Sequence, residues 1–212
     1  MGDRKTAVEF YNAAASAIND KSNTQNTTTA YQLFVSAVYA DPTWWMAHYQ
    51  CGNNIADLEH HAAAVACYRR SLHCEMTDAE RAKVCANICD RLRIIGRASE
   101  SAEYGLEATR LDPKNQAGWI NLAVTWQILR EVKKSVECAE RAYALDENNV
   151  AAQIALAFAL LFDGQYVRGL DVFECRYRYA LHSFTQYPYP KWRGEKDCTL
   201  MLVADQGMGD TL

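Results

Sequence analysis

Apolar and small residues recur along this chain at intervals of three, four and seven positions, which is the spacing of one face of an α-helix. Short polar turns separate these stretches, and each stretch is long enough for three or four helical turns. The pattern predicts an all-α protein in which helices follow one another in pairs.

The paired pattern repeats with a fixed period. The dipeptide Leu-Asp at residues 111–112 returns 34 residues later at 145–146. Asp-Pro at 41–42 returns 71 residues later at 112–113, which equals two periods plus three residues. We place this three-residue insertion near residues 79–81. Proline tolerates the first turn of a helix and disfavours helix in the residue before it, so Asp-Pro marks the start of a unit.

Within a unit, the first helix carries a large residue, an apolar one at plus three, a small one at plus four and an apolar one at plus seven. The small residue lets the second helix approach closely. Three units show the pattern most clearly, with His48, Cys51, Gly52 and Ile55, then Cys85, Ile88, Cys89 and Leu92, then Trp119, Leu122, Ala123 and Trp126.

This period and pattern resemble the tetratricopeptide-repeat family. The resemblance implies an all-α superhelical solenoid of about five helix-turn-helix repeats, followed by a short extended tail. The solenoid is expected at residues 1–181, with repeats at 7–44, 45–78, 82–115, 116–149 and 150–183. A polar run at residues 19–29 separates the two helices of the first repeat and is longer than an ordinary turn.

In that family the first helix of each repeat lines a concave groove, and the resemblance therefore implies a protein or peptide partner. Counted from the start of each unit, the sixth position (the sixth slot) lies in the first helix and holds an amide in three successive units. Polar residues follow one helical turn later. A carboxamide can donate to and accept from the backbone of an extended chain at once. The candidate groove residues are Gln50, Asn53, Asn87, Asp90, Arg93 and Asn121.

The row of amides is similar to the asparagine ladder in the repeat domain of O-linked N-acetylglucosamine transferases. The alternative is that these amides simply face water. The fifth slot holds Tyr49, Ala86 and Ile120 rather than lysine, so a clamp for a C-terminal carboxylate is not expected. The last first helix, at 150–162, is apolar nearly all round. It is expected to be covered by the tail or to form an apolar docking site.

The residues after the solenoid differ in composition. We expect a linker at 182–198, and then a buried strand in the apolar run of residues 199–204. A glycine-rich bend follows, with Gly207, Gly209 and Asp210. Glycines in such a bend let backbone N–H groups face a phosphate. An unpaired strand of this kind is expected to pack on the last repeat, to remain disordered, or to pair with a second copy.

The end of the chain resembles a junction found in certain bacterial proteins, which join these repeats to a glycosyltransferase of the GT-B, heptosyltransferase-like type. The resemblance lies in the motif Pro-x-Trp-x-Gly, the expected strand, and the motif Gln-Gly-x-Gly-Asp-Thr-Leu that follows it. The resemblance implies that the chain is the acceptor-recruiting arm of such an enzyme, truncated at the start of the catalytic domain. Gly207, Gly209 and Asp210 would then belong to a nucleotide-sugar loop of the parent. The alternative is a free-standing adaptor with no link to glycosylation.

The composition of the chain makes several classes of partner unexpected. A net charge of −4 gives no general attraction to nucleic acid or to an anionic membrane. No stretch approaches the length of a transmembrane helix, and a cytoplasmic protein with reduced cysteines is expected. Cys85 and Cys89 lie one turn apart, but no paired C-x-x-C motif accompanies them, so no metal is expected. The adjacent His60 and His61 lack the neighbours of a catalytic site, and no cofactor is expected for the chain itself.

Overall fold

The computed structural model describes residues 2–19 and 26–175, and all regular secondary structure in these two ranges is α-helical. The predicted all-α class is therefore confirmed. The described helices are α1 (Arg4–Asn19), α2 (Asn26–Ala40), α3 (Trp45–Asp57), α4 (His61–Ser71), α5 (Asp78–Ile94), α6 (Ala98–Leu111), α7 (Gln116–Ile128), α8 (Val132–Leu145), α9 (Val150–Phe162) and α10 (Tyr166–Phe173).

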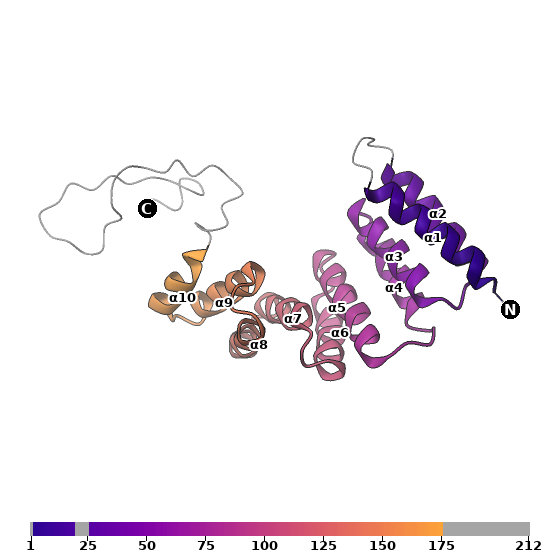
Figure 1. Ribbon diagram of the computed structural model, residues 1–212. Coiled ribbons are helices and arrows are strands. Elements are labelled where there is room, and N and C mark those ends of the chain that lie inside the picture. Colours follow the sequence, from indigo (N-terminus) through magenta and orange to yellow (C-terminus); the bar gives the residue numbers. More distant parts are fainter. Residues whose placement is uncertain (1, 20–25, 176–212) are drawn as a thin grey trace, which may run out of the picture.

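Consecutive helices pack as pairs, and the pairs follow one another in a row from the N-terminus to α10 (Figure 1). Each second helix also packs against the first helix of the next pair. In addition, α5 packs on α7 and α7 packs on α9, whereas no comparable contact joins α6 to α8 or α8 to α10. The first helices therefore lie closer together than the second helices, which places them on the inner face of the row.

Helix α5 is one turn longer than the other first helices from α3 onward. It has 17 residues, whereas α3, α7 and α9 each have 13. The added turn lies at its N-terminus, where Thr77 and Glu80 form a reciprocal capping box. The insertion expected near residues 79–81 falls in this turn.

The close approach of paired helices depends on a small residue in the middle of the first one. A Cβ atom added to Gly52 would lie 2.5 Å from Cε1 of Tyr68 on the partner helix, well inside a normal carbon–carbon contact. Tyr68 is 1% exposed and fills the space that Gly52 leaves. The small residue at this position of the repeat thus allows the close approach of the paired helices that the sequence predicts.

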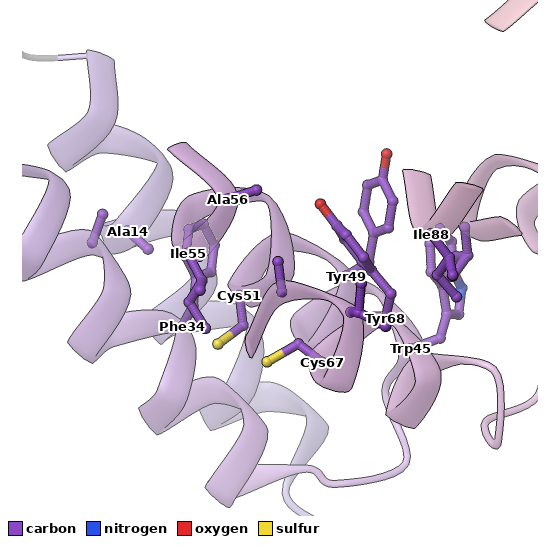
Figure 2. Packing of buried hydrophobic residues seen from close by; sticks show 14 of the residues in the cluster. Ala14, Phe34, Trp45, Tyr49, Cys51, Ile55, Ala56, Cys67, Tyr68 and Ile88 are labelled. Carbon is purple, nitrogen blue, oxygen red and sulfur yellow. The ribbon is translucent and has the colours of Figure 1, made fainter. Parts of the chain in front are cut away.

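Buried side chains form two main clusters along the row. The first runs from α1 to α5 and includes Phe34, Tyr68 and Ile88 (Figure 2). The second runs from α6 to α10 and includes Leu122 and Leu156. A small third cluster of Cys85, Ala86 and Ala108 lies where the two meet.

The seven cysteines within the described residues are all free thiols. Cys51 on α3 and Cys67 on α4 face each other (Figure 2). The hydrogen bond between the two thiols, together with burial, raises the pKa of Cys51 above its ordinary value. Cys51 therefore belongs to the packed interior as a protonated thiol.

Candidate functional site

A chain of hydrogen-bonded amide and phenol groups runs across the first three helix pairs. Nε2 of Gln50 donates to Oη of Tyr11 at 3.2 Å, and Nδ2 of Asn53 donates to Oε1 of Gln50 at 2.7 Å. Oδ1 of Asn53 accepts from Oη of Tyr68 at 2.8 Å and from Nδ2 of Asn87 at 3.0 Å. The chain joins groups from α1, α3, α4 and α5, so it fixes the positions of these helices relative to one another.

Two tyrosines on α3 and α4 extend this network. Nδ2 of Asn87 also donates to Oη of Tyr49 at 3.1 Å. Nζ of Lys83 lies 5.0 Å from the centre of the Tyr49 ring, a cation–π contact. Burial raises the pKa of the Tyr68 phenol above its usual value, so this group stays protonated and keeps its role as a donor.

Side-chain amides also connect neighbouring first helices further along the row. Nδ2 of Asn121 on α7 donates to the carbonyl oxygen of Ala86 on α5 at 2.9 Å. Nε2 of Gln127 donates to the carbonyl oxygen of Ala155 on α9 at 3.4 Å. Both N–H groups of Asn87 and one N–H group of Asn121 are thus engaged within the fold. Their Oδ1 atoms accept no hydrogen bond from the described residues, and both side chains are partly exposed.

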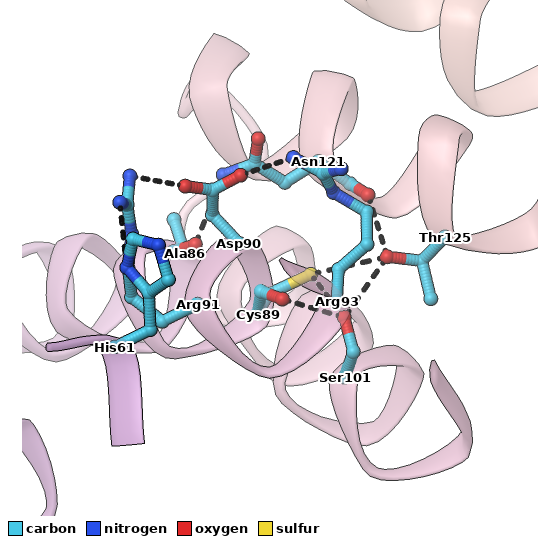
Figure 3. Close-up of polar contacts among 9 residues, drawn as sticks. All are labelled: His61, Ala86, Cys89, Asp90, Arg91, Arg93, Ser101, Asn121 and Thr125. Atoms are coloured by element: carbon cyan, nitrogen blue, oxygen red, sulfur yellow. Dashed lines mark hydrogen bonds and ion pairs between the residues drawn. The ribbon is translucent and has the colours of Figure 1, made fainter. Parts of the chain in front are cut away.

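The charged groups of the candidate groove are paired with one another. The carboxylate of Asp90 forms ion pairs with both Arg91 and Arg93 (Figure 3). Nη1 of Arg91 also lies 3.5 Å from Nδ1 of His61. Nε of Arg93 is shielded from solvent and donates to no described atom. The groove near α5 therefore offers the Nε donor of Arg93, and its ion-paired group of one carboxylate and two guanidinium groups is net positive.

Behind the groove, a buried polar cluster joins α5, α6 and α7 (Figure 3). Oγ of Ser101 donates to the carbonyl oxygen of Cys89 at 2.6 Å and lies 2.9 Å from Oγ1 of Thr125. Burial raises the pKa of the Cys89 thiol, so it is protonated rather than nucleophilic. In the next unit, Oγ of Ser135 donates to the carbonyl oxygen of Ala123 at 2.9 Å, repeating the contact. The cluster locks helix register and has no feature of a reactive site.

The two ends of the inner face differ in chemistry. Helices α7 and α9 contain no charged residue at all. The exposed fractions of Ile128, Phe158 and Phe162 are 52%, 40% and 59%. The inner face therefore carries charged groups along α5 and none along α7 and α9.

Among the residues expected from the sequence, the structure brings Gln50, Asn53 and Asn87 into one hydrogen-bonded group. Asn121 lies on the next first helix and bonds to α5 through the Ala86 carbonyl instead. The sequence interpretation missed Tyr11, Tyr49 and Tyr68. Only their place in the helical pattern, next to the amide slots, could have indicated them.

Other expectations fall outside the described residues. These are the linker at 182–198, the strand at 199–204, the glycine-rich bend with Gly207, Gly209 and Asp210, and pairing of the strand with a second copy. Within the described ranges, no three His, Cys, Asp or Glu side chains come together in a way that could hold a metal ion. None of the described helices is both long and apolar enough to cross a membrane.

The paired helices, the period and the packed small slots define a helical-repeat protein with the tetratricopeptide-repeat fold. MamA from Desulfovibrio magneticus RS-1, from its residue 41 to its end, has this fold with a TM-score of 0.69 and 14% identity, covering 86% of this chain and 99% of that chain. For PilF of Pseudomonas aeruginosa the TM-score is 0.68 with 19% identity, covering 82% and 76%.

YrrB, described as a TPR protein with an unusual peptide-binding site, has a TM-score of 0.60 and 14% identity, covering 79% of this chain and 83% of that chain. At these identities the likeness concerns the fold. No family model matches the chain.

Two curated proteins are similar in sequence. Protein FlbA of Caulobacter vibrioides is 29% identical over 123 residues, which are 55% of this chain and 21% of FlbA. Superkiller protein 3 of Saccharomyces cerevisiae is 28% identical over 76 residues, which are 36% of this chain and 5% of that protein. The chain thus spans a minor part of both relatives, and none of the comparisons links it to glycosylation.

Proposed function

We propose that this protein is an interaction scaffold that holds an extended segment of another polypeptide along its inner face. The observation that carries the proposal is that the carboxamide oxygens of Asn87 and Asn121, at the same position of neighbouring first helices, accept no hydrogen bond from the part of the chain that the structure describes. Each can accept an N–H from the backbone of an extended chain. A solved relative in fold, YrrB, is described as having a peptide-binding site, which supports the same class of function.

The network of Tyr11, Gln50 and Asn53 gives this scaffold a preorganised surface. Because both N–H groups of Asn87 and one N–H group of Asn121 donate within the fold, the oxygens of these two residues are held in place before the ligand arrives. Preorganisation lowers the entropy cost of binding. The Asn87 amide therefore acts only as an acceptor for the ligand, whereas Asn121 keeps one N–H group that can also donate.

A random-sequence library of twelve-residue peptides tests the proposal. Peptides selected on the wild-type protein should bind about tenfold more weakly to Asn121→Ala, because one hydrogen bond to the backbone is lost. Methylation of a single backbone nitrogen should abolish binding of a selected peptide at the position that faces Asn121. A matched control is Glu103→Ala, since Glu103 is exposed on a second helix.

Thermal melting of each variant separates binding from stability. Asn87 donates to both Asn53 and Tyr49, so Asn87→Ala is expected to lower the melting temperature as well as the affinity. If selected peptides bind Asn121→Ala as tightly as wild type, and tolerate every backbone methylation, the proposal of backbone recognition is wrong.

We keep as a second proposal that the scaffold serves a glycosyltransferase. It is supported only by the sequence string that includes Gly207, Gly209 and Asp210, outside the described residues. The adaptor without a link to glycosylation is better supported by the solved structures. The reading frame beyond Leu212 distinguishes the two, since a following domain of parallel strands and helices favours the enzyme arm and its absence contradicts it.

A further inference from the structure

Two cysteines face each other where α3 and α4 are in close contact. Cys51 on α3 is the chain neighbour of Gly52, and Cys67 on α4 is the chain neighbour of Tyr68, the residue that packs on Gly52. The two sulfur atoms point toward one another (Figure 2), and the thiols share a hydrogen bond. A disulfide bond needs two cysteines on backbones that are already close, and this position provides them.

The facing cysteines are specific to this helix pair. Counted by the repeat, Cys51 corresponds in the later first helices to Ile88, Leu122 and Leu156. Cys67 corresponds in the later second helices to Tyr104, Cys138 and Val172. No cysteine precedes residue 51 in the sequence, so among the described helix pairs only α3 and α4 carry a thiol at both positions. The other pairs pack without paired thiols, so the repeat fold does not account for them.

The two thiols differ in acidity. The hydrogen bond from Cys51 holds the pKa of Cys67 below its ordinary value, although burial opposes this shift, and the positive charge of Arg70 adds to the lowering. Cys51 is the donor of that hydrogen bond and keeps its proton. Burial raises the pKa of four other thiols, namely Cys74, Cys85, Cys89 and Cys138. Among these cysteines, Cys67 therefore has the largest thiolate fraction and reacts first with an oxidant.

We propose that Cys51 and Cys67 are a site of reversible oxidation, at which hydrogen peroxide converts the two thiols into a disulfide bond between α3 and α4. The thiolate sulfur of Cys67 attacks one oxygen of the peroxide, and the O–O bond breaks. The other oxygen leaves as hydroxide and takes up the proton that Cys67 had released. The sulfur of Cys51 then attacks the sulfenic acid on Cys67, whose hydroxyl group leaves as water with the Cys51 proton. The two thiols thus lose two electrons, and one peroxide becomes two water molecules.

The surroundings of the two thiols suit this reaction. Cys67 is 8% exposed and Cys51 is 5% exposed, so a small oxidant can reach the Cys67 sulfur while most larger molecules are kept out. Cys51 is already in contact with Cys67, so it consumes the sulfenic acid before further oxidation. Asn53 on α3 accepts a hydrogen bond from Tyr68 on α4 at 2.8 Å, close to both cysteines in the chain. The disulfide bond therefore fixes the helix pair that carries the polar network of the inner face.

Peptide mapping of the full chain identifies the bond. The protein is treated with hydrogen peroxide, its remaining thiols are blocked with N-ethylmaleimide under denaturing conditions, and it is digested with trypsin and a glutamate-specific protease. Cleavage after Glu59 separates Cys51 from Cys67, and cleavage after Arg70 separates Cys67 from Cys74. Two peptides joined through Cys51 and Cys67 should appear after oxidation and disappear after dithiothreitol. A bond from either cysteine to a different one, or no joined peptides, would overturn the proposal.

Two variants provide an independent measurement. Cys51→Ala removes the second thiol, so Cys67 should stop at the sulfenic acid and form an adduct with dimedone. Cys138→Ala is the matched control, because Cys138 is the counterpart of Cys67 in a pair without a facing thiol. Oxidation should raise the melting temperature of wild type and of Cys138→Ala by roughly 5–10 °C, since the bond restricts the unfolded chain.

The same treatment should leave the melting temperature of Cys51→Ala without this rise. If Cys51→Ala shows the same rise, or no dimedone adduct on Cys67, the assignment is wrong. The peptide map of the wild-type protein decides the question even if Cys51→Ala fails to fold.

Discussion

A methyl group at position 52 should destabilise the solenoid, although alanine is the better helix former. At a helix position with free space, Gly→Ala stabilises by about 1 kcal/mol. Here the added Cβ would lie 2.5 Å from Cε1 and 2.7 Å from Cδ1 of Tyr68, whereas carbon atoms pack at about 3.5 to 4.0 Å. The ring or the helix must therefore move by roughly 1 Å.

Tyr68 has little freedom to make that movement. Its ring is 1% exposed, its centre lies 5.8 Å from that of Tyr49, and its Oη atom donates to Asn53. Overpacking of this kind costs about 1–3 kcal/mol, and the rigid Tyr68 ring places Gly52→Ala in the upper part of that range, at about 2–3 kcal/mol. We expect Gly52→Ala to lower the free energy of unfolding by about 1–2 kcal/mol after the helix gain is included.

Urea denaturation followed by circular dichroism at 222 nm measures this difference. The control is Gly118→Ala, because a Cβ atom there would lie 3.3 Å from its nearest neighbour, Cβ of Ala108, so that this methyl group needs to move much less than the Tyr68 ring. The control variant should be as stable as wild type or slightly more stable. If Gly52→Ala matches Gly118→Ala in midpoint, close packing of Tyr68 on Gly52 is not what sets the distance between α3 and α4.

Three further variants or reagents test other parts of the fold. Burial alone would raise the pKa of the Asp41 carboxyl, but hydrogen bonds from Arg4 and Thr43 outweigh it and hold that pKa below its ordinary value. The ionised group therefore stabilises the fold above its unfolded pKa, and this contribution is lost as the pH falls through the lower folded value. The stability advantage of wild type over Asp41→Asn in urea should accordingly shrink below about pH 4, and a constant difference would contradict the assignment. Thr77→Ala removes the capping box of α5 and should cost about 1 kcal/mol in the same assay, whereas no change would show that the added turn is held by other contacts. Burial raises the pKa of Cys85 to about 11, so iodoacetamide at pH 8 should modify it only after unfolding, and rapid labelling of the native protein would be the contrary result.

The paired helices could be predicted from the sequence because their cause is local. Apolar spacing sets the helical faces, and the small slot at Gly52 marks the closest approach of two helices that are neighbours in the chain. The same reasoning placed three extra residues near 79–81, where α5 gains its first turn. Both features depend on residues within a single repeat, so a period read along the chain is enough to find them.

The hydrogen-bonded network could not be predicted in the same way. Tyr11 and Gln50 come from different units, and their contact depends on how far one helix pair is rotated on the next. The amides in the sixth slot were predicted to be available to a ligand. In the structure, Asn87 and Asn121 instead donate N–H groups in hydrogen bonds to neighbouring helices. A repeat pattern predicts the position of a side chain in the helix, but it does not predict which of its atoms form hydrogen bonds with the neighbouring unit.

The division of the interior into two main clusters has a mechanical consequence. The clusters meet at α5 and α6 through small side chains, among them Ala86 and Ala108. Small side chains bury little area, so at this junction the hydrogen bonds of Ser101 with Cys89 and Thr125 supply cohesion that large apolar side chains supply within each half. A ligand that spans α3 to α7 would cross this junction and would act as a brace between the two halves of the interior.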